Sequence, residues 1–146
     1  MFAYCNSLKS LNYGKINTEK VENMSNLFEE CYHLDSIDLN NFNTKNVRDM
    51  SNMFMNCLRL KNIDLSSFNK INVENMSGMF HSCKMIYSFD VRTFDTIKVK
   101  NMSKMFYNCQ SLSSIELENF DIKNIENMDY ILYSCPSLKY IDISTF

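Results

Sequence analysis

Cysteine recurs at a fixed interval along this chain of 146 residues. Successive cysteines are 26 residues apart, and they are Cys5, Cys31, Cys57, Cys83, Cys109 and Cys135. A fixed interval of this length indicates one supersecondary unit that is copied along the chain. The interval therefore predicts the fold, and it leaves few residues outside the repeat that would form an active site.

Other residue types keep the same register, and we call the residues at one place in successive units a column. Phenylalanine stands three residues before five of the six cysteines, and Leu or Ile stands three residues after each of the six. The unit reads C-x2-L-x2-I-D-L-x2-F-[ND]-x3-V-x-N-M-S-x-M-F-x2. No insertion breaks the register, so the repeat covers the whole chain.

One unit contains the patterns of a strand, a turn and a short helix. Residues 34–40 alternate apolar and polar side chains, which predicts a short strand with one buried face. Residues 40–46 are rich in turn-forming residues. The apolar residues that follow recur at steps of three and four, which predicts one face of a short helix. They are Val47, Met50, Met53, Phe54 and Cys57.

The start of this helix is open from the sequence. Either Ser51 caps a helix that begins there, or the helix begins near Val47 and the serine lies within it. In both cases the helix has two to three turns and needs its neighbours to be stable.

Units of this kind predict an α/β fold, a right-handed solenoid of 26-residue strand–turn–short helix units. One parallel sheet would form one side, with the helices on the opposite side. We expect a single domain over residues 1–146, with between five and six units. Neither end has the polar cap that stacked repeats need, so we expect an excised part of a longer array, whose ends could stack end to end.

Composition and charge argue against several functions. The formal net charge of −2 gives no basic footprint for nucleic acid. No apolar run approaches the roughly 18 residues that cross a bilayer, so we expect no membrane insertion by this segment. The chain has no Gly-rich phosphate loop, and its reactive residue types belong to repeat columns. We therefore expect no catalytic residues, no cofactor, no metal site and no enzyme activity.

The cysteine column has three interpretations. Each cysteine shares its inward face with Phe and Met, and free Cys packs as a small hydrophobic residue, which favours a ladder of buried thiols. Disulfides between neighbouring units are an alternative, although the Cα atoms must then lie within about 7 Å. Metal binding is a further alternative, although no Cys-x2-Cys pair is present.

Two segments carry a family resemblance. The L-x2-I-x-L pattern resembles the leucine-rich repeat, and residues 60–68 together with 75–83 (N-M-S-G-M-F-H-S-C) look closer to BspA-like leucine-rich repeat surface proteins. Their repeat is known as the DUF285 bacterial surface repeat, and the resemblance covers the whole chain. It departs mainly in the last unit, where Asp129 replaces Ser and Ile131-Leu132 replaces Met-Phe. The resemblance implies a cell-surface or extracellular location and a role in adhesion or host-protein binding, although no signal peptide is visible in this segment.

An acidic column is the main candidate for recognition. Its members lie between the two inward residues of each predicted strand, so they should face outward from the sheet. They are Asp38, Asp64, Asp90, Glu116 and Asp142. Adjacent like charges destabilise a sheet, and a basic partner surface or a cation would compensate them. The alternative is a structural role, in which flanking Ser, Asn and Lys residues solvate the carboxylates.

Four residues break the repeat pattern on the same face. They are Tyr87, Arg92, Glu118 and Tyr140. Aromatic residues and Arg are common interface anchors, although ordinary surface variation also explains them.

These features predict a non-catalytic protein-interaction module of a cell-surface protein. It would bind a protein or a glycan through the exposed sheet face. The alternative is a structural spacer or stalk that projects another domain and has no ligand of its own.

Overall fold

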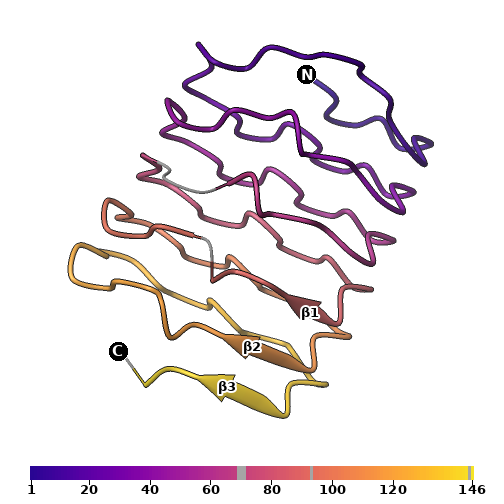
Figure 1. The fold of residues 1–146 in the computed structure, drawn as a ribbon. Helices are drawn as coiled ribbons and strands as arrows, with labels where there is room; N and C mark the ends of the chain where they lie inside the picture. Colours follow the sequence, from indigo (N-terminus) through magenta and orange to yellow (C-terminus); the bar gives the residue numbers. More distant parts are fainter. Residues whose placement is uncertain (69–71, 93, 145) are drawn as a thin grey trace.

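The computed structural model describes residues 1–68, 72–92, 94–144 and 146. The chain winds in successive coils that stack along one axis, with the first and last coils at opposite ends (Figure 1). In the described residues, three short strands occur: β1 (Ser88–Phe89), β2 (Ser114–Glu116) and β3 (Tyr140–Asp142). They pair in parallel in the order β1-β2-β3 and lie one above the other on the same side of the stack.

The sheet register equals the sequence repeat. Ile115 of β2 lies opposite Phe89 of β1 and Ile141 of β3, each 26 residues away. Phe89 and Ile115 are buried, while the residues beside them in the strands are partly or fully exposed. Each coil of the stack therefore contains one repeat unit, and successive residues of one column lie on adjacent coils.

The predicted strand–turn–helix solenoid with helices opposite the sheet is wrong. None of the described residues forms a helix, and among them no helix is long and apolar enough to span a membrane. The apolar stripe instead forms two consecutive four-residue turns. In the segment that ends at Cys31, these turns are residues 24–27 and 28–31. Each is closed by a hydrogen bond from the N–H of its fourth residue to the C=O of its first, at 3.3 and 3.2 Å.

The third residue of each turn has a positive φ. In the second unit these are Asn26 (56°) and Glu30 (58°). A positive φ at this position is the feature of a type II turn, and it is incompatible with a right-handed helix. The first positive-φ column is Asn26, Asn52, Gly78, Lys104 and Tyr130. The second is Tyr4, Glu30, Asn56, Ser82, Asn108 and Ser134.

Hydrogen bonds between coils replace those of a helix. Alternate N–H groups of the turn segment donate to carbonyl oxygens 25 residues later in the chain. In the second unit the pairs are Met24–Asp49, Asn26–Ser51, Phe28–Met53 and Glu30–Met55, at 2.8 to 2.9 Å. Buried backbone groups need partners, and the next coil supplies them. The turn segment is therefore stabilised by its neighbours in the stack.

Neither predicted helix start applies, because the segment begins with an Asx turn. In such a turn, a side-chain carbonyl oxygen accepts a hydrogen bond from the backbone N–H two residues on. The Oδ1 atoms of one column accept such bonds at 2.7 to 3.1 Å, and isolated parallel bridges join the same residues across the coils. They are Asn23, Asp49, Asn75, Asn101 and Asn127. The residue two positions on, a serine in four of these five turns and Asp129 in the fifth, is the donor of the turn and does not cap a helix.

Two ladders of side chains run through the core. The rings of one phenylalanine column stack with centroids 5.4 to 5.9 Å apart and planes within 10° of parallel, and their members are Phe2, Phe28, Phe54, Phe80 and Phe106. The cysteines form the second ladder, in which each thiol from the second to the sixth donates to a phenylalanine carbonyl 29 residues earlier, as Cys83 Sγ does to Phe54 O at 3.2 Å.

The predicted ladder of buried free thiols is confirmed for the inner cysteines. Cys31, Cys57, Cys83 and Cys109 are buried and free, Cys135 is half-buried, and Cys5 is exposed. Burial raises the pKa of the Cys83 thiol well above its usual value, so the inner thiols pack as neutral, apolar groups.

Candidate binding surface

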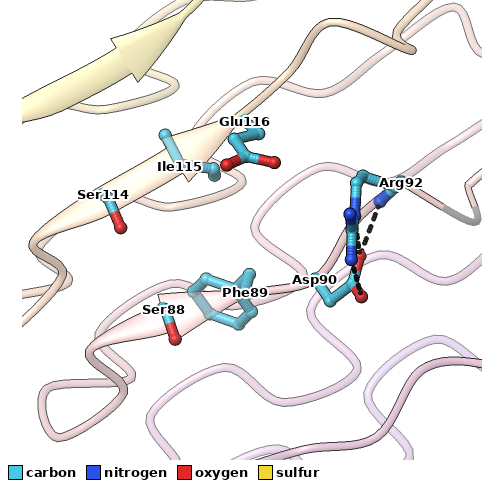
Figure 2. Close-up of a pocket in the computed structure, with 7 residues that line it drawn as sticks. All are labelled: Ser88, Phe89, Asp90, Arg92, Ser114, Ile115 and Glu116. Atoms are coloured by element: carbon cyan, nitrogen blue, oxygen red, sulfur yellow. Dashed lines mark hydrogen bonds and ion pairs between the residues drawn. The ribbon is translucent and has the colours of Figure 1, made fainter.

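A shallow hollow lies where β1 and β2 run side by side. It has a volume of about 240 Å³ and is lined by Ser88, Phe89, Asp90, Arg92, Ser114, Ile115 and Glu116 (Figure 2). Phe89 and Ile115 form its floor, because their side chains belong to the core. The hollow brings together Asp90, Arg92 and Glu116, which the sequence had singled out from two different units.

An ion pair between Arg92 and Asp90 lies at one side of this hollow. Arg92 Nε donates to Asp90 Oδ1 at 3.0 Å, and Arg92 Nη2 donates to Asp90 Oδ2 at 2.9 Å (Figure 2). This hydrogen bonding lowers the pKa of Asp90 and raises that of Arg92, and the charges of Glu116 and Glu118 raise the Arg92 pKa further. The side chains of Arg92 and Asp90 are 58% and 60% exposed, so solvent screens the pair and it contributes little to stability.

The carboxylates of the acidic column have a structural role. Oδ1 of four members accepts the backbone N–H two residues on, which closes an Asx turn at the end of the strand position in each coil. The distances are 2.9 Å for Asp38, 2.9 Å for Asp64, 3.2 Å for Asp90 and 2.9 Å for Asp142. These hydrogen bonds give four members of the column a role within their own coils that needs no ligand.

The same hydrogen bonds offset the mutual repulsion of the column. Bonds to the Ser66 side chain and backbone lower the pKa of Asp64, while the Asp90 charge in the next coil raises it more weakly. The Ser144 backbone N–H is the largest cause of a lowered pKa at Asp142. Local donors therefore favour the ionised form of both carboxylates.

The remaining predicted residues lie around this hollow and beyond it. Tyr87, just before β1, is 56% exposed, and Tyr140 in β3 is 54% exposed. The Tyr140 hydroxyl donates to Asp142 Oδ2 at 3.3 Å, and the Asp142 charge raises the pKa of Tyr140. Glu118 is exposed after β2 and lines a different hollow with residues 119–123. Asp38 and Asp64 lie on earlier coils, so the structure spreads the predicted residues along the stack.

Sequence reasoning missed a column of alternating charge. Its members are Glu22, Arg48, Glu74, Lys100 and Glu126. Glu74 accepts Arg48 Nη1 at 3.1 Å and Lys100 Nζ at 3.3 Å, and these two cations lower its pKa. Unlike the acidic column, this column compensates itself across the coils. The alternation is readable in the sequence once residues are compared by column.

Sequence reasoning also missed an exposed aromatic cluster. The rings of His81, Tyr107 and Tyr133 stack across three coils, with centroids 4.7 and 5.2 Å apart. Tyr130 meets Tyr133 at 84° with a centroid distance of 5.6 Å. Together with Lys104 these residues line a hollow. The sequence does contain a sign of this cluster, because His81, Tyr107 and Tyr133 are aromatic residues in one column that has no consensus residue.

The fold and its outer columns define a repeat protein whose side chains vary on the outside of a regular core. The chain matches the family model DUF285, described as a Mycoplasma protein of unknown function, over residues 1–90 and 63–146, so it belongs to this family. No curated protein and no solved structure matches the chain. The predicted membership of DUF285 is confirmed, while the surface location and the adhesive role stay predictions.

Proposed function

We propose that this chain is a non-catalytic interaction module that binds a basic protein surface through its acidic sheet face. We define the acidic sheet face as the column Asp38, Asp64, Asp90, Glu116 and Asp142. The observation that carries the proposal is the placement of one outward carboxyl group on each successive coil, which gives a row of negative charge. Neighbouring strands lie about 4.8 Å apart, so a partner with Lys or Arg side chains along one face can meet several carboxylates at once.

The residues around this row are of the kinds that anchor interfaces. Tyr87 and Tyr140 each expose more than half of their side chains beside it, and Tyr and Arg are enriched among residues that dominate binding energy. The Arg92–Asp90 pair is exposed and contributes little, so an incoming basic group can displace Arg92. Complementary charge of this kind chiefly speeds association and selects the partner.

The likeness to BspA-like surface proteins supports a place for this module on the cell surface. In that setting the partner would be a host or matrix protein, and the activity would be adhesion. A binding module of this type needs neither a cofactor nor a catalytic residue, since its affinity comes from contacts distributed over several coils.

A second candidate function is a structural spacer. The Asx turns of Asp38, Asp64 and Asp142 favour it, because they give each carboxylate a role within its own coil. A spacer would have no ligand, and its acidic column would serve only the fold.

The experiment compares the native chain with the double variant Asp64→Asn and Asp90→Asn. Asparagine keeps the carbonyl oxygen that closes the Asx turn and removes only the charge. The control is Asp95→Asn, because Asp95 also closes an Asx turn, to Ile97 N at 3.1 Å, but lies outside the acidic sheet face. Binding is measured by biolayer interferometry against purified extracellular-matrix and plasma proteins.

We expect the double variant to lose about tenfold in affinity, mainly at low salt, for a partner that Asp95→Asn binds normally. Equal affinity of the double variant would overturn the role of the acidic sheet face. No binding of the native chain to any of these proteins at micromolar concentration would favour the spacer.

A further inference from the structure

We propose that a second surface of this protein binds an acidic sugar. We call this surface the aromatic hollow, and it is formed by His81, Lys104, Tyr107, Tyr130 and Tyr133. Its volume is about 500 Å³, within the range of small-ligand sites. It shares no residue with the acidic sheet face, so the inference does not depend on the function proposed above.

The backbone of three coils holds the aromatic hollow in place. His81, Tyr107 and Tyr133 each follow a residue of the phenylalanine column or its equivalent, and hydrogen bonds between coils keep them in register. Ser82 N donates to Tyr107 O at 2.7 Å, and Asn108 N donates to Tyr133 O at 2.8 Å. The rings therefore stack at the spacing of the coils, and the site is formed before any ligand arrives.

The first positive-φ column completes the aromatic hollow. Lys104 has a φ of 57° and Tyr130 a φ of 60°, and both side chains are exposed beside the ring stack. Stacked rings cover each other's faces, but the outer part of Tyr133 and the perpendicular ring of Tyr130 form an open corner. These two side chains are 57% and 58% exposed. Such a corner offers apolar surface at two angles.

The chemistry of this corner suits a sugar ring. A pyranose has an apolar C–H face and a rim of hydroxyl groups, and aromatic rings with hydroxyl tips present the matching pair of properties. In the part of the chain that the structure describes, the polar side-chain atoms of the five lining residues make no hydrogen bond or ion pair with the protein. Phenol, imidazole and ammonium groups therefore remain available to the ligand as donors and acceptors.

The charge of the aromatic hollow points to a carboxylate on that sugar. Lys104 carries the ammonium group, and none of the five lining residues is acidic. Burial, with the nearby Lys104 charge as a smaller cause, lowers the pKa of His81, so its ring is neutral near pH 7. A single cation beside an apolar corner matches a ring that bears one carboxylate, as in a uronic acid.

An acidic peptide fits the aromatic hollow less well. Extended peptides gain affinity from main-chain hydrogen bonds to an open sheet edge. Here the backbone donors at Phe80, Ser82, Lys104 and Phe106 already bond to the next coil, at 2.7 to 2.9 Å. Recognition must therefore come from side chains, which is the way in which sugars are held.

The test uses two probes with the same sugar rings, tetragalacturonic acid and its full methyl ester, in which no carboxylate charge remains. Affinities are measured by isothermal titration calorimetry, and contact with the Tyr rings by saturation-transfer NMR. We expect the native chain to bind the acid about two- to fivefold more tightly than the ester, as an exposed ion pair allows. Lys104→Gln should remove this difference between the two probes.

Two tyrosine variants locate the site. Tyr133→Ala should weaken binding of both probes by about fivefold or more. The matched control is Tyr87→Ala, because Tyr87 is exposed to a similar extent on the other surface, and its affinity should not change. Circular dichroism and thermal unfolding check that each variant folds. If Tyr133→Ala does not fold, Lys104→Gln and Tyr133→Phe decide the outcome. Tyr133→Phe keeps the ring and removes only the hydroxyl contact.

Several results would overturn the proposal. They are no binding of tetragalacturonic acid by the native chain at millimolar concentration, equal affinity for acid and ester, or equal loss in Tyr87→Ala and Tyr133→Ala. Binding of tetraglutamate as tightly as tetragalacturonic acid would also overturn it, because the hollow would then recognise charge without the sugar ring.

Discussion

Replacing Lys104 by glycine tests whether the apolar segment of each unit is a pair of turns or a helix. Lys104 has a φ of 57°, and a left-handed conformation costs a residue other than glycine roughly 1–2 kcal/mol. Glycine removes this cost but adds about 0.4–1 kcal/mol of unfolded-state entropy. The expected net gain in the free energy of unfolding is about 0.5–1 kcal/mol. In a helix the same change would lose about 1 kcal/mol, so the sign alone distinguishes the two structures.

The matched control is Lys84→Gly in the preceding coil. Lys84 is half-buried and its φ is not positive, so the same chemical change should cost about 0.4–1 kcal/mol there. The lysine side chains make no hydrogen bond or ion pair in the described residues, so little else changes. Lys104→Gly should therefore raise the free energy of unfolding and Lys84→Gly should lower it, with a difference of about 1.5 kcal/mol between the two variants.

Equilibrium unfolding in urea gives the comparison. With a slope of about 2 kcal/mol/M, Lys104→Gly should raise the midpoint by about 0.3–0.5 M and Lys84→Gly should lower it by a similar amount. Midpoints are compared only where the slope is unchanged, since stacked units do not always unfold in one step. If both variants are destabilised equally, residue 104 is not left-handed and the paired-turn structure is wrong.

Three further predictions follow from the core and from the acidic column. Phe80→Ala should lower the free energy of unfolding by about 3–5 kcal/mol, measured by urea unfolding, because its ring is fully buried in the phenylalanine ladder; a loss below about 1 kcal/mol would contradict this packing. Cys5 should react with a thiol reagent at once, whereas Cys83 should react only on unfolding, because burial shields its thiol and raises its pKa; equal rates in the native protein would refute the thiol ladder. Hydrogen bonds from Ser66 lower the pKa of Asp64 in the folded state, so its contribution to stability is present above the unfolded pKa of about 4 and is lost as pH falls through the folded value. Asp64→Asn should flatten this part of the acid dependence of the melting temperature, and an unchanged acid profile would show that the Asx turn does not depend on the charge.

The register of the fold was predictable from the sequence, but the local structure of the apolar segment was not. Spacings of three and four are typical of a helix face, and two consecutive four-residue turns produce the same spacings. The difference lies in the residues at the third turn position, where Asn26, Asn52 and Gly78 tolerate a positive φ. This signal was weak, because Glu30, Lys104 and other residues that rarely adopt such angles occupy equivalent places.

The candidate surfaces were predictable to different degrees. The outward position of the acidic column could be predicted from the alternation of apolar and polar residues in the expected strand. A structural role for its carboxylates was one of the two interpretations that the sequence left open. The Asx turns of Asp38 and Asp64 give that alternative a specific form. The aromatic hollow was not found, because its members occupy columns without a consensus residue. Only the stacking of coils shows that His81, Tyr107 and Tyr133 are neighbours.

The way in which the coils are joined explains why specificity can reside in such columns. Backbone hydrogen bonds hold one coil to the next, so the outward side chains of the turn segment are not needed for the stack. The column that contains His81 accordingly changes from Glu29 and Met55 to His81, Tyr107 and Tyr133 along the chain, while the phenylalanine beside it stays constant through Phe106. A ligand site can therefore be built by substitution in one outward column, while the phenylalanine beside it stays unchanged through Phe106.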